Sequence, residues 1–314
     1  MRGLIALDWG TSSLRAMRMN ADGEVLETRR QPWGIRQLPP GGFAGALAAV
    51  TAGWPALPRI ASGMVGSRGG WREVAYLELP AGGEQLARAL DRGEGLPTVG
   101  LPIVPGLRNA RGPDVMRGEE TQIVGLVAQH PEAADATVLL PGTHSKWVSL
   151  RQGRVIDFCT LMTGELFALL RQHSILAAGV DAAAVTDAGG AFLDGVRQAR
   201  DSGAAGALSR LFAIRARMLD GVLPASSIPD YLSGLLIGEE FRCMRADRRM
   251  PTDQPLWLIG DAALCARYRL AAAEFSIALA PAVDDTAAAG LWWLARAAGL
   301  LGSIASDIST GVSP

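Results

Sequence analysis

The sequence contains little cysteine and little histidine, and these few residues are scattered. Its 314 residues include three cysteines and three histidines. The cysteines form no CxxC pair, and their odd number gives no complete disulfide framework, so the composition fits a reducing compartment. The histidines lie too far apart for a zinc motif such as HExxH. These absences argue against a disulfide-stapled secreted domain and against a zinc enzyme of that type.

The sequence also lacks an excess of one charge and a long apolar run. Its 30 basic and 31 acidic residues argue against a nucleic-acid partner and against a polybasic membrane patch. The apolar stretches 41–54 and 269–283 are too short, or interrupted by Glu274, to span a membrane. The short apolar run before Asp8 is unlike a secretory signal. We therefore expect a soluble cytoplasmic protein that binds small molecules, with homo-oligomers left open.

Two common nucleotide-binding motifs are absent as well. The sequence contains no GxxxxGK[ST] and no well-placed GxGxxG, so a P-loop or a Rossmann dinucleotide site lacks its usual support. The chain is, however, long enough for about two domains. It also has 49% hydrophobic residues, which is enough for sizeable cores.

A pattern of strands and turns stands near the start of the chain, in residues 3–30. An apolar strand at 4–7 ends at Asp8 and a glycine turn. Residues 14–19 follow, and periodicity alone allows either strand or helix there. An Asn-Ala-Asp-Gly turn signal and an alternating strand at 24–28 complete the unit, which favours strands throughout.

The second half of the chain repeats this order. Runs at 137–140, 146–150 and 155–160 are strand candidates, separated by turns that contain glycine. A G-T-x-S turn follows the first strand in both halves, at an offset of 132 residues, and the hairpin glycines Gly23 and Gly153 are 130 residues apart. A unit that opens each half predicts an α/β protein with two similar lobes.

The two G-T-x-S turns are candidate phosphate sites. Backbone N–H groups and hydroxyls in such turns can form an anion-binding nest. The same residue types are also common in ordinary turns, which is the alternative. The candidate phosphate-binding residues are Gly10, Thr11, Ser12, Ser13, Gly142, Thr143, His144, Ser145 and Lys146.

Three carboxylates are candidates for catalysis. Asp8 ends a strand, where it could hold Mg²⁺ through water or simply cap the turn. Glu119 and Glu120 fall in the first turn of a predicted helix within 117–129, where acids also suit the helix dipole. One of these two glutamates could take the proton from a hydroxyl that attacks a γ-phosphate.

These features resemble the hexokinase, actin and Hsp70 superfamily, whose sugar kinases carry an acid-x-Gly-Thr motif in the first hairpin. A closer resemblance is to the 2-dehydro-3-deoxygalactonokinase family, over essentially the whole chain. It is carried by the segments DWGTSSLRAM, SGMVGSRGGWREVAYLELPAG, PGLR, PDVMRGEETQIVG, LLPGTHSKWV and TLMTGELFALLRQHSIL. The resemblance implies an actin-like ATPase (ribonuclease H-like) fold with a central cleft between the lobes. It also implies ATP and Mg²⁺ as cofactors, and phosphorylation of 2-keto-3-deoxygalactonate at its 6-hydroxyl.

Two positions depart from the superfamily pattern. The base is usually an aspartate, whereas the matching residue here is Glu119, so the choice between Glu119 and Glu120 stays open. The adenosine segment, matched by 256–273, often contains Gly-Gly, whereas this chain has Gly260 followed by Asp261. Asp261 could accept a ribose hydroxyl or cap the helix that follows it.

Two further sets of residues are candidate contacts for adenosine and for the sugar acid. Gly234 and Gly238 give a predicted helix at 230–244 a smooth face, either for adenine or for close packing of another helix. A sugar acid needs arginines or N–H groups for its carboxylate, although surface-turn and N-cap roles are alternatives. The candidates for this role are Arg15, Ser62, Gly63, Ser67, Arg68, Trp71, Arg108, Thr163 and Gly164.

The expected domains are an N-terminal lobe at 1–132 and a C-terminal lobe at 133–314. The first lobe would hold the first hairpin, the sugar-acid loops and the acidic helix. The second would hold the second hairpin and the adenosine segment, and the final helix could cross back to the first lobe. The alternatives are a phosphoanhydride hydrolase similar to exopolyphosphatases, a kinase for the gluconate-derived epimer, and a non-enzymatic ATP-dependent switch or filament module.

Overall fold

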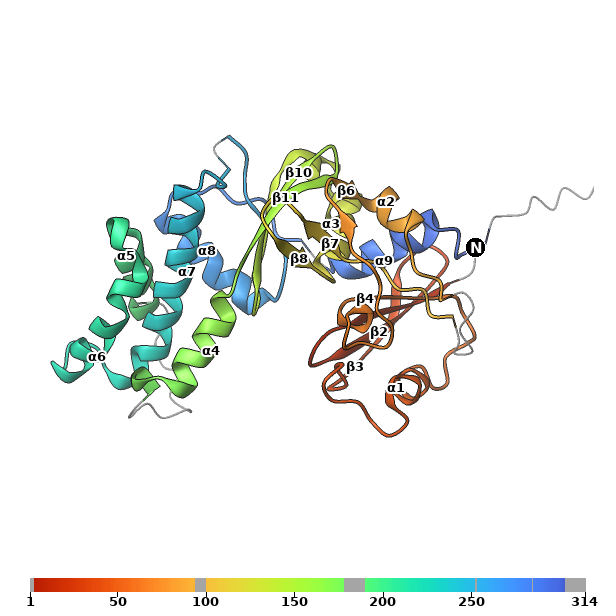
Figure 1. Ribbon diagram of the computed structural model, residues 1–314, viewed down its shortest axis with the longest axis horizontal. Helices are drawn as coiled ribbons and strands as arrows, with labels where there is room; N and C mark the ends of the chain where they lie inside the picture. The colour runs from red at the N-terminus through yellow and green to blue at the C-terminus, as the bar shows by residue number, and fades with distance from the viewer. Residues whose placement is uncertain (1–2, 94–99, 178–189, 252, 284, 303–314) are drawn as a thin grey trace, which may run out of the picture. The chain divides into compact units, whose positions relative to one another are not determined.

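The computed structural model describes residues 3–93, 100–177, 190–251, 253–283 and 285–302 (Figure 1). The chain forms two compact units. The first consists of Met1–Pro131 and Asp285–Pro314, and the second of Glu132–Asp284. Each unit combines strands and helices, so the predicted α/β class is confirmed.

The sheet of the first unit has the strand order β3-β2-β1-β4. Its strands are β1 (Leu4–Trp9), β2 (Leu14–Met19), β3 (Val25–Gln31) and β4 (Arg59–Ser62). β1 pairs antiparallel with β2 and parallel with β4, while β2 pairs antiparallel with β3. Residues 14–19 are therefore a strand and not a helix.

The second unit repeats this arrangement with the order β12-β9-β10-β11. Its strands are β9 (Thr137–Leu140), β10 (Ser145–Arg151), β11 (Arg154–Leu161) and β12 (Trp257–Leu258). β9 pairs antiparallel with β10 and parallel with β12, and β10 pairs antiparallel with β11. The repeat that the sequence predicts is confirmed, and it extends to a fourth, parallel strand in each unit.

The hairpin glycines adopt the backbone conformation that their turns require. Gly23 has a φ of +90° and Gly153 a φ of +69°. Gln152, before Gly153, is also left-handed at +51°. Two successive residues with positive φ are typical of a type I′ turn, whose twist matches that of the flanking strands.

A small sheet and four helices complete the first unit (Figure 1). The small sheet has the order β5-β7-β8, with β5 (Leu77–Glu78), β7 (Leu107–Asn109) and β8 (Asp114–Met116). The short strand β6 (Ala81–Gly82) does not belong to it. The helices are α1 (Gly42–Val50), α2 (Gly83–Arg88), α3 (Glu119–Gln129) and α9 (Thr286–Ala297). Helices α3 and α9 cross at Gly125 and Gly290, where a methyl group on either glycine would lie within 2 Å of a backbone oxygen of the other helix. The last described helix thus packs in the first unit.

The described part of the second unit also contains five α-helices, several of which pack on one another. They are α4 (Thr163–His173), α5 (Gly190–Arg200), α6 (Leu211–Leu219), α7 (Ile228–Ala246) and α8 (Ala262–Glu274). Helix α7 is buried along most of its length, and its Phe241 packs against Trp147 of β10 and Tyr268 of α8. This core fixes the strand ends and helix starts that form the candidate site.

The described helices include none that is both long enough and apolar enough to cross a lipid bilayer.

Candidate active site

The first G-T-x-S turn presents backbone N–H groups on its open side. The Gly10 N–H closes the turn by donating to the Ser13 carbonyl at 2.9 Å. The carbonyls of Gly10 and Thr11 accept from the N–H groups of Ile35 and Arg36 at 3.1 and 3.3 Å. Because C=O and N–H point in opposite directions across a trans peptide, the N–H groups of Thr11 and Ser12 point away from that neighbouring loop. The turn can therefore offer them to an anion.

Asp8 stands at the end of β1 and forms an ion pair with Arg15. The Arg15 Nη2 lies 3.3 Å from the Asp8 carboxylate, and its Nη1 lies 2.9 Å from that of Asp285. Burial raises the pKa of Asp8, while the Arg15 charge opposes this rise. Arg15, expected to contact phosphate or substrate, thus lies between two carboxylates.

Asp285 is a residue that the sequence analysis missed. Its side chain caps α9 by accepting from the Ala288 N–H, which is the role of an aspartate directly before a helix. An N-cap signal was therefore visible in the sequence. Its contact with Arg15, which lies 270 residues away in the chain, was not.

The carboxylates of Asp8 and Asp285 fit a magnesium ion. Mg²⁺ keeps several waters and is usually held by one or two protein carboxylates together with substrate phosphates. The side chains of Asp8 and Asp285 are 35% and 43% exposed, so both can reach a hydrated ion. No group of three or more His, Cys, Asp or Glu residues suited to a metal occurs in the described part of the chain.

Two glycines bring the start of α3 next to the end of β1. Ser62, at the end of β4, is the register partner of Asp8. Gly63 follows, and a methyl group on it would lie 2.8 Å from the Trp9 carbonyl oxygen. A methyl group on Gly118 would lie 3.4 Å from the Gly63 Cα. The structure therefore places the first hairpin, the Ser62–Gly63 loop and the acidic helix side by side in the first unit.

The two glutamates at the start of α3 lie in different environments. Glu119 is half-buried, and its Oε2 accepts from the Arg117 N–H at 3.0 Å. Glu120 is 1% exposed and accepts from the Gly118 N–H at 2.6 Å and from the Thr121 hydroxyl at 3.2 Å. Burial and the neighbouring Glu119 charge raise the pKa of Glu120 to about 8. Glu120 therefore holds a proton through most of the neutral range.

The sugar-acid candidates of the first unit are only partly brought together. Arg68 and Arg108 are exposed, and Arg108 lies 3.9 Å from Glu78. The Ser67 hydroxyl donates to the Met64 carbonyl at 2.7 Å. Trp71 is half-buried and stacks on Phe43, with ring centroids 5.7 Å apart, against the apolar core. The ring of Trp71 is a large apolar surface, and packing on the core removes part of it from water.

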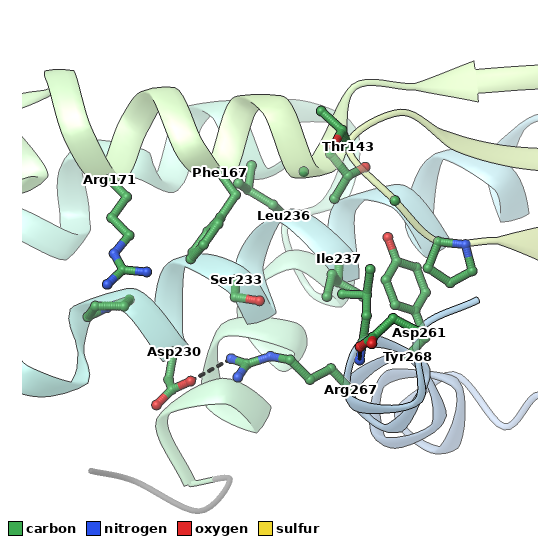
Figure 2. Close-up of a pocket in the computed structure, with 16 residues that line it drawn as sticks. Thr143, Phe167, Arg171, Asp230, Ser233, Leu236, Ile237, Asp261, Arg267 and Tyr268 are labelled. Carbon is green, nitrogen blue, oxygen red and sulfur yellow. Dashed lines mark hydrogen bonds and ion pairs between the residues drawn. The ribbon is translucent and has the colours of Figure 1, made fainter. Parts of the chain in front are cut away.

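The second unit contains a cavity of about 590 Å³ beside its own G-T-x-S turn (Figure 2). Phe167 and Arg171 reach it from α4, and Arg267 and Tyr268 reach it from α8. Proline and leucine side chains line much of the rest, and Thr143 marks the end next to the turn. A mostly apolar cavity with a few polar groups is suited to a nucleoside.

Helix α4 supports the second turn. The Glu165 N–H donates to the Thr143 carbonyl at 3.0 Å, and Glu165 Oε2 lies 2.5 Å from His144 Nε2. A methyl group on Gly164 would lie 2.5 Å from the Gly142 carbonyl oxygen, so only glycine allows this approach. Thr143 and His144 remain exposed at the tip.

The structure gives the surroundings of four further candidate residues near this turn. Thr163 and Gly164, expected at the sugar acid, line the cavity of the second unit. The side chains of Ser145 and Lys146 are buried, at 0% and 4% exposed. Ser145 is hydrogen-bonded to the Tyr268 hydroxyl at 2.9 Å. Both residues belong to β10, whose first four residues are buried.

The adenosine candidates divide into two pairs. Gly260 lies beside Pro141 at the start of the turn, and Asp261 both lines the cavity and caps α8 by accepting from the Leu264 N–H at 3.0 Å. Gly234 and Gly238 face α5 instead, where a methyl group on Gly234 would lie 1.9 Å from the Phe192 carbonyl oxygen. The alternative of close helix packing therefore holds for this second pair.

An ion pair in the cavity wall was not foreseen. Arg267 Nη2 lies 2.5 Å from Asp230 Oδ1 (Figure 2), and its guanidinium stacks 4.6 Å from the Phe192 ring centroid. Asp230 lies in the first turn of α7, and Arg267 lies in α8. The two side chains form an ion pair because these helices pack together.

Comparisons with known proteins agree on one family. The family model described as 2-keto-3-deoxy-galactonokinase matches residues 8–294. The chain is 36% identical to the 2-dehydro-3-deoxygalactonokinase of Escherichia coli (strain K12), over 90% of this chain and 94% of that protein. It is 42% identical to the probable 2-dehydro-3-deoxygalactonokinase DgoK1 of Rhizobium meliloti (strain 1021), over 93% of this chain and 96% of that protein.

Solved structures extend the likeness to the fold. A crystal structure of a candidate 2-dehydro-3-deoxygalactonokinase from Sinorhizobium meliloti superposes with a TM-score of 0.81 at 39% identity, covering 94% of this chain and 98% of that one. The activator of 2-hydroxyisocaproyl-CoA dehydratase from Clostridium difficile, with bound ADPNP, gives 0.52 at 13% identity, covering 94% and 95%. The fold is the two-lobed actin-like ATPase fold that the sequence predicts. This chain belongs to the 2-keto-3-deoxy-galactonokinase family.

Proposed function

We propose that the protein is an ATP-dependent kinase that phosphorylates 2-dehydro-3-deoxy-D-galactonate at its 6-hydroxyl, in galactonate breakdown. Membership of the kinase family supports an alcohol as phosphoryl acceptor. The observation that carries the proposal is the nucleoside-sized cavity that ends at the G-T-x-S turn of the second unit. A cavity for the nucleoside next to a turn for its phosphates is the arrangement that a kinase needs.

Glu119 is the proposed general base. Its carboxylate takes the proton of the 6-hydroxyl while that oxygen forms a bond to the γ-phosphorus. The bond from the γ-phosphorus to the β–γ bridging oxygen breaks, and ADP leaves. Glu120 is less suited to this role, because its carboxyl is buried and its raised pKa keeps it protonated near neutral pH.

Asp8 is the proposed residue for Mg²⁺, with Asp285 as its neighbour. When bound, the ion would neutralise charge on the β- and γ-phosphates. Asp8 would orient the ion through its waters, since its carboxylate is partly exposed and one carboxylate is enough for this ion. Arg15 holds the two carboxylates in place through its two ion pairs.

The N–H groups of both turns are proposed to bind the phosphate chain of one ATP. The turns share one sheet topology, and a neighbouring segment holds two carbonyls of the first turn and the Thr143 carbonyl of the second. The N–H groups of Thr11 and Ser12 are therefore directed to the open side of the first turn, and that of His144 is directed away from α4 in the second. Preorganised donors of this kind stabilise charge on the transferred phosphoryl group.

The sugar acid is proposed to bind at the Ser62–Gly63 loop of the first unit. This loop lies next to the start of α3, which carries Glu119. Arg68 is the proposed partner of the substrate carboxylate, since its exposed guanidinium is close in sequence and can make two parallel hydrogen bonds. All three cysteines of the chain are thiols and not part of a disulfide, which fits our proposal of a cytoplasmic enzyme.

The test is a coupled assay for ADP with a panel of keto-deoxy sugar acids and Mg-ATP. We expect turnover with 2-dehydro-3-deoxygalactonate, and little ADP without any sugar acid. Phosphate release in the absence of sugar acid would identify a hydrolase instead. Preference for the gluconate-derived epimer would correct the substrate while leaving the reaction type intact.

A further inference from the structure

A buried carboxyl group lies beneath the second turn, at Glu240 of α7. Glu240 is 1% exposed. Its Oε1 accepts from Trp147 Nε1 at 2.7 Å, and its Oε2 accepts from the Tyr268 hydroxyl at 2.8 Å. The Thr163 hydroxyl also donates to Oε2. One side chain in the interior of the second unit thus receives three side-chain hydrogen bonds.

The three donors come from three different elements around the cavity. Trp147 belongs to β10, Thr163 is the first residue of α4, and Tyr268 belongs to α8. Thr163 and Tyr268 both line the cavity, and Tyr268 is labelled in Figure 2. Glu240 itself lies behind them on α7. The Glu240 carboxyl therefore connects β10, α4 and α8 by hydrogen bonds, although Glu240 itself does not line the cavity.

Two connections lead from Glu240 to the second turn. On one side, the Tyr268 hydroxyl donates a hydrogen bond to Glu240. Because its single hydrogen is used there, the Ser145 hydroxyl donates to the Tyr268 oxygen at 2.9 Å. Ser145 ends the turn. On the other side, the hydrogen bond from Thr163 to Glu240 fixes the start of α4. The next two residues of this helix contact the turn at Gly142 and Thr143.

We propose that Glu240 is a positioning residue for ATP binding, which holds the second turn through Ser145 and through the start of α4. The inference rests on the proposed function, because it concerns the nucleotide that the kinase uses. Glu240 does not touch the nucleotide. It acts through Tyr268 and Thr163, whose hydroxyl groups it directs.

The chemistry of the buried group supports positioning over simple packing. A leucine or methionine would fill similar space without the cost of removing a carboxyl group from water. A carboxyl that receives three donors instead fixes the directions of several side chains at once. Each donor would be left without its acceptor if the carboxyl were lost, and buried unpaired groups are unfavourable.

The experiment measures binding of Mg-ATP to the full-length protein by titration calorimetry without sugar acid, together with steady-state kinetics. Glu240→Gln cannot accept all three donors, and Tyr268→Phe removes one hydroxyl while leaving Glu240 in place. We expect the Kd for ATP to rise about tenfold in each variant. The KM for the sugar acid should stay within about twofold of the original value.

Tyr231→Phe is the matched control. Tyr231 is also buried, belongs to α7, and accepts a hydrogen bond from Arg217 at 2.9 Å, away from the second turn. Like Tyr268→Phe, the Tyr231→Phe variant loses one tyrosine hydroxyl group. Its Kd for ATP should equal that of the unaltered protein. A thermal melt of each variant reports any general loss of stability.

The following results decide the matter. If Tyr268→Phe and Glu240→Gln weaken ATP binding no more than Tyr231→Phe, Glu240 has only a structural role and the inference is overturned. It is overturned as well if the KM values for ATP and for the sugar acid rise together. If Glu240→Gln fails to fold, Tyr268→Phe alone decides between these outcomes. Should the unaltered protein bind no Mg-ATP, the proposed function fails and the inference falls with it.

Discussion

The two G-T-x-S turns share one frame but differ in length. In the first unit, β1 and β2 pair up to Trp9 and Leu14, which leaves four residues in the turn. In the second unit, β9 and β10 pair only up to Leu140 and Lys146, which leaves five. Pro141 takes the place of Trp9, and it has no N–H for the strand ladder. The two similar motifs therefore form turns of different length.

The environment of the last turn residue differs even more. Ser13 is exposed, whereas Ser145, at the matching position, is completely buried and bonded to Tyr268. Partly exposed carboxylates stand by the first turn, and a buried carboxyl stands behind the second. The comparison shows that the repeat preserves the strand topology, whereas the side chains around the two turns differ. Each turn can therefore have a different role. We infer chemistry at the first turn and nucleotide positioning at the second.

The largest expected effect distinguishes the two glutamates of the first unit. Glu119→Gln should lower kcat about 10²- to 10⁴-fold, because the hydroxyl would lose its proton acceptor. ATP binding, measured by calorimetry, should stay within about twofold.

Glu120→Gln is the matched control, since a neutral amide resembles the protonated carboxyl at that position. It should retain kcat within about tenfold. A larger loss in Glu120→Gln than in Glu119→Gln would reverse our assignment of the base.

A second pair of variants tests the support of each turn. A methyl group on Gly34 would lie 2.2 Å from the Thr11 carbonyl oxygen, and one on Gly164 would lie 2.5 Å from that of Gly142. Both are backbone contacts, so the turn must shift in Gly34→Ala and in Gly164→Ala. We expect kcat/KM for ATP to fall at least about tenfold in both.

Gly112→Ala serves as the control, because open space surrounds that position. Its kcat/KM for ATP should stay unchanged. If Gly164→Ala lowers kcat/KM while Gly34→Ala does not, the first turn takes no part in nucleotide binding, and the proposed equivalence of the two turns is wrong.

A third prediction concerns pH and the buried carboxyl of the first unit. The pKa of Glu120 is raised from 4.5 to about 8 in the folded protein. The folded state therefore keeps this proton at pH values where the unfolded chain has lost it. Stability should fall as pH rises from about 4.5 to about 8, by at most about 1.4 kcal/mol per pH unit.

Urea unfolding of the original protein and of Glu120→Gln, at several pH values between 5 and 8, isolates this effect. The variant carries no titrating group at position 120. The difference between its free energy of unfolding and that of the original protein should therefore increase, in favour of the variant, as pH rises. Parallel pH profiles for the two proteins would show that Glu120 titrates normally.

The smallest expected effect separates two roles of Asp261. As the N-cap of α8, it should contribute about 1 kcal/mol to the free energy of unfolding, which Asp261→Ala would remove and Asp261→Asn would largely keep. If Asp261 also accepts a ribose hydroxyl, Asp261→Ala should raise the KM for ATP more than the KM for a 2′-deoxy analogue. Equal effects on both nucleotides would leave capping as its role.

Much of the frame could be predicted from local sequence. Apolar runs that end at glycine turns identified the repeated strands, and the acidic first turn located α3 correctly. Asp261 was recognised as a candidate cap for the same reason: each of these features depends on residues within a few positions of one another. The domain boundaries and the roles of the site residues stay predictions.

The remaining features depend on packing between distant segments. Nothing near Glu240 in the sequence shows that Trp147 and Tyr268 will donate to it, from 93 and 28 residues away. Arg15 meets Asp285 only because α9 packs in the first unit. Trp71 stacks on Phe43, which lies 28 residues earlier in the chain, and nothing local in the sequence indicates this contact.

The most direct test is a crystal structure of the protein with Mg²⁺ and a non-hydrolysable ATP analogue. Backbone N–H groups of residues 10–13 and of residues 142–145 should both lie within about 3.2 Å of phosphate oxygens of the same nucleotide. The base and ribose should occupy the cavity beside Tyr268. A nucleotide whose phosphates touch only one of the two turns would contradict the account.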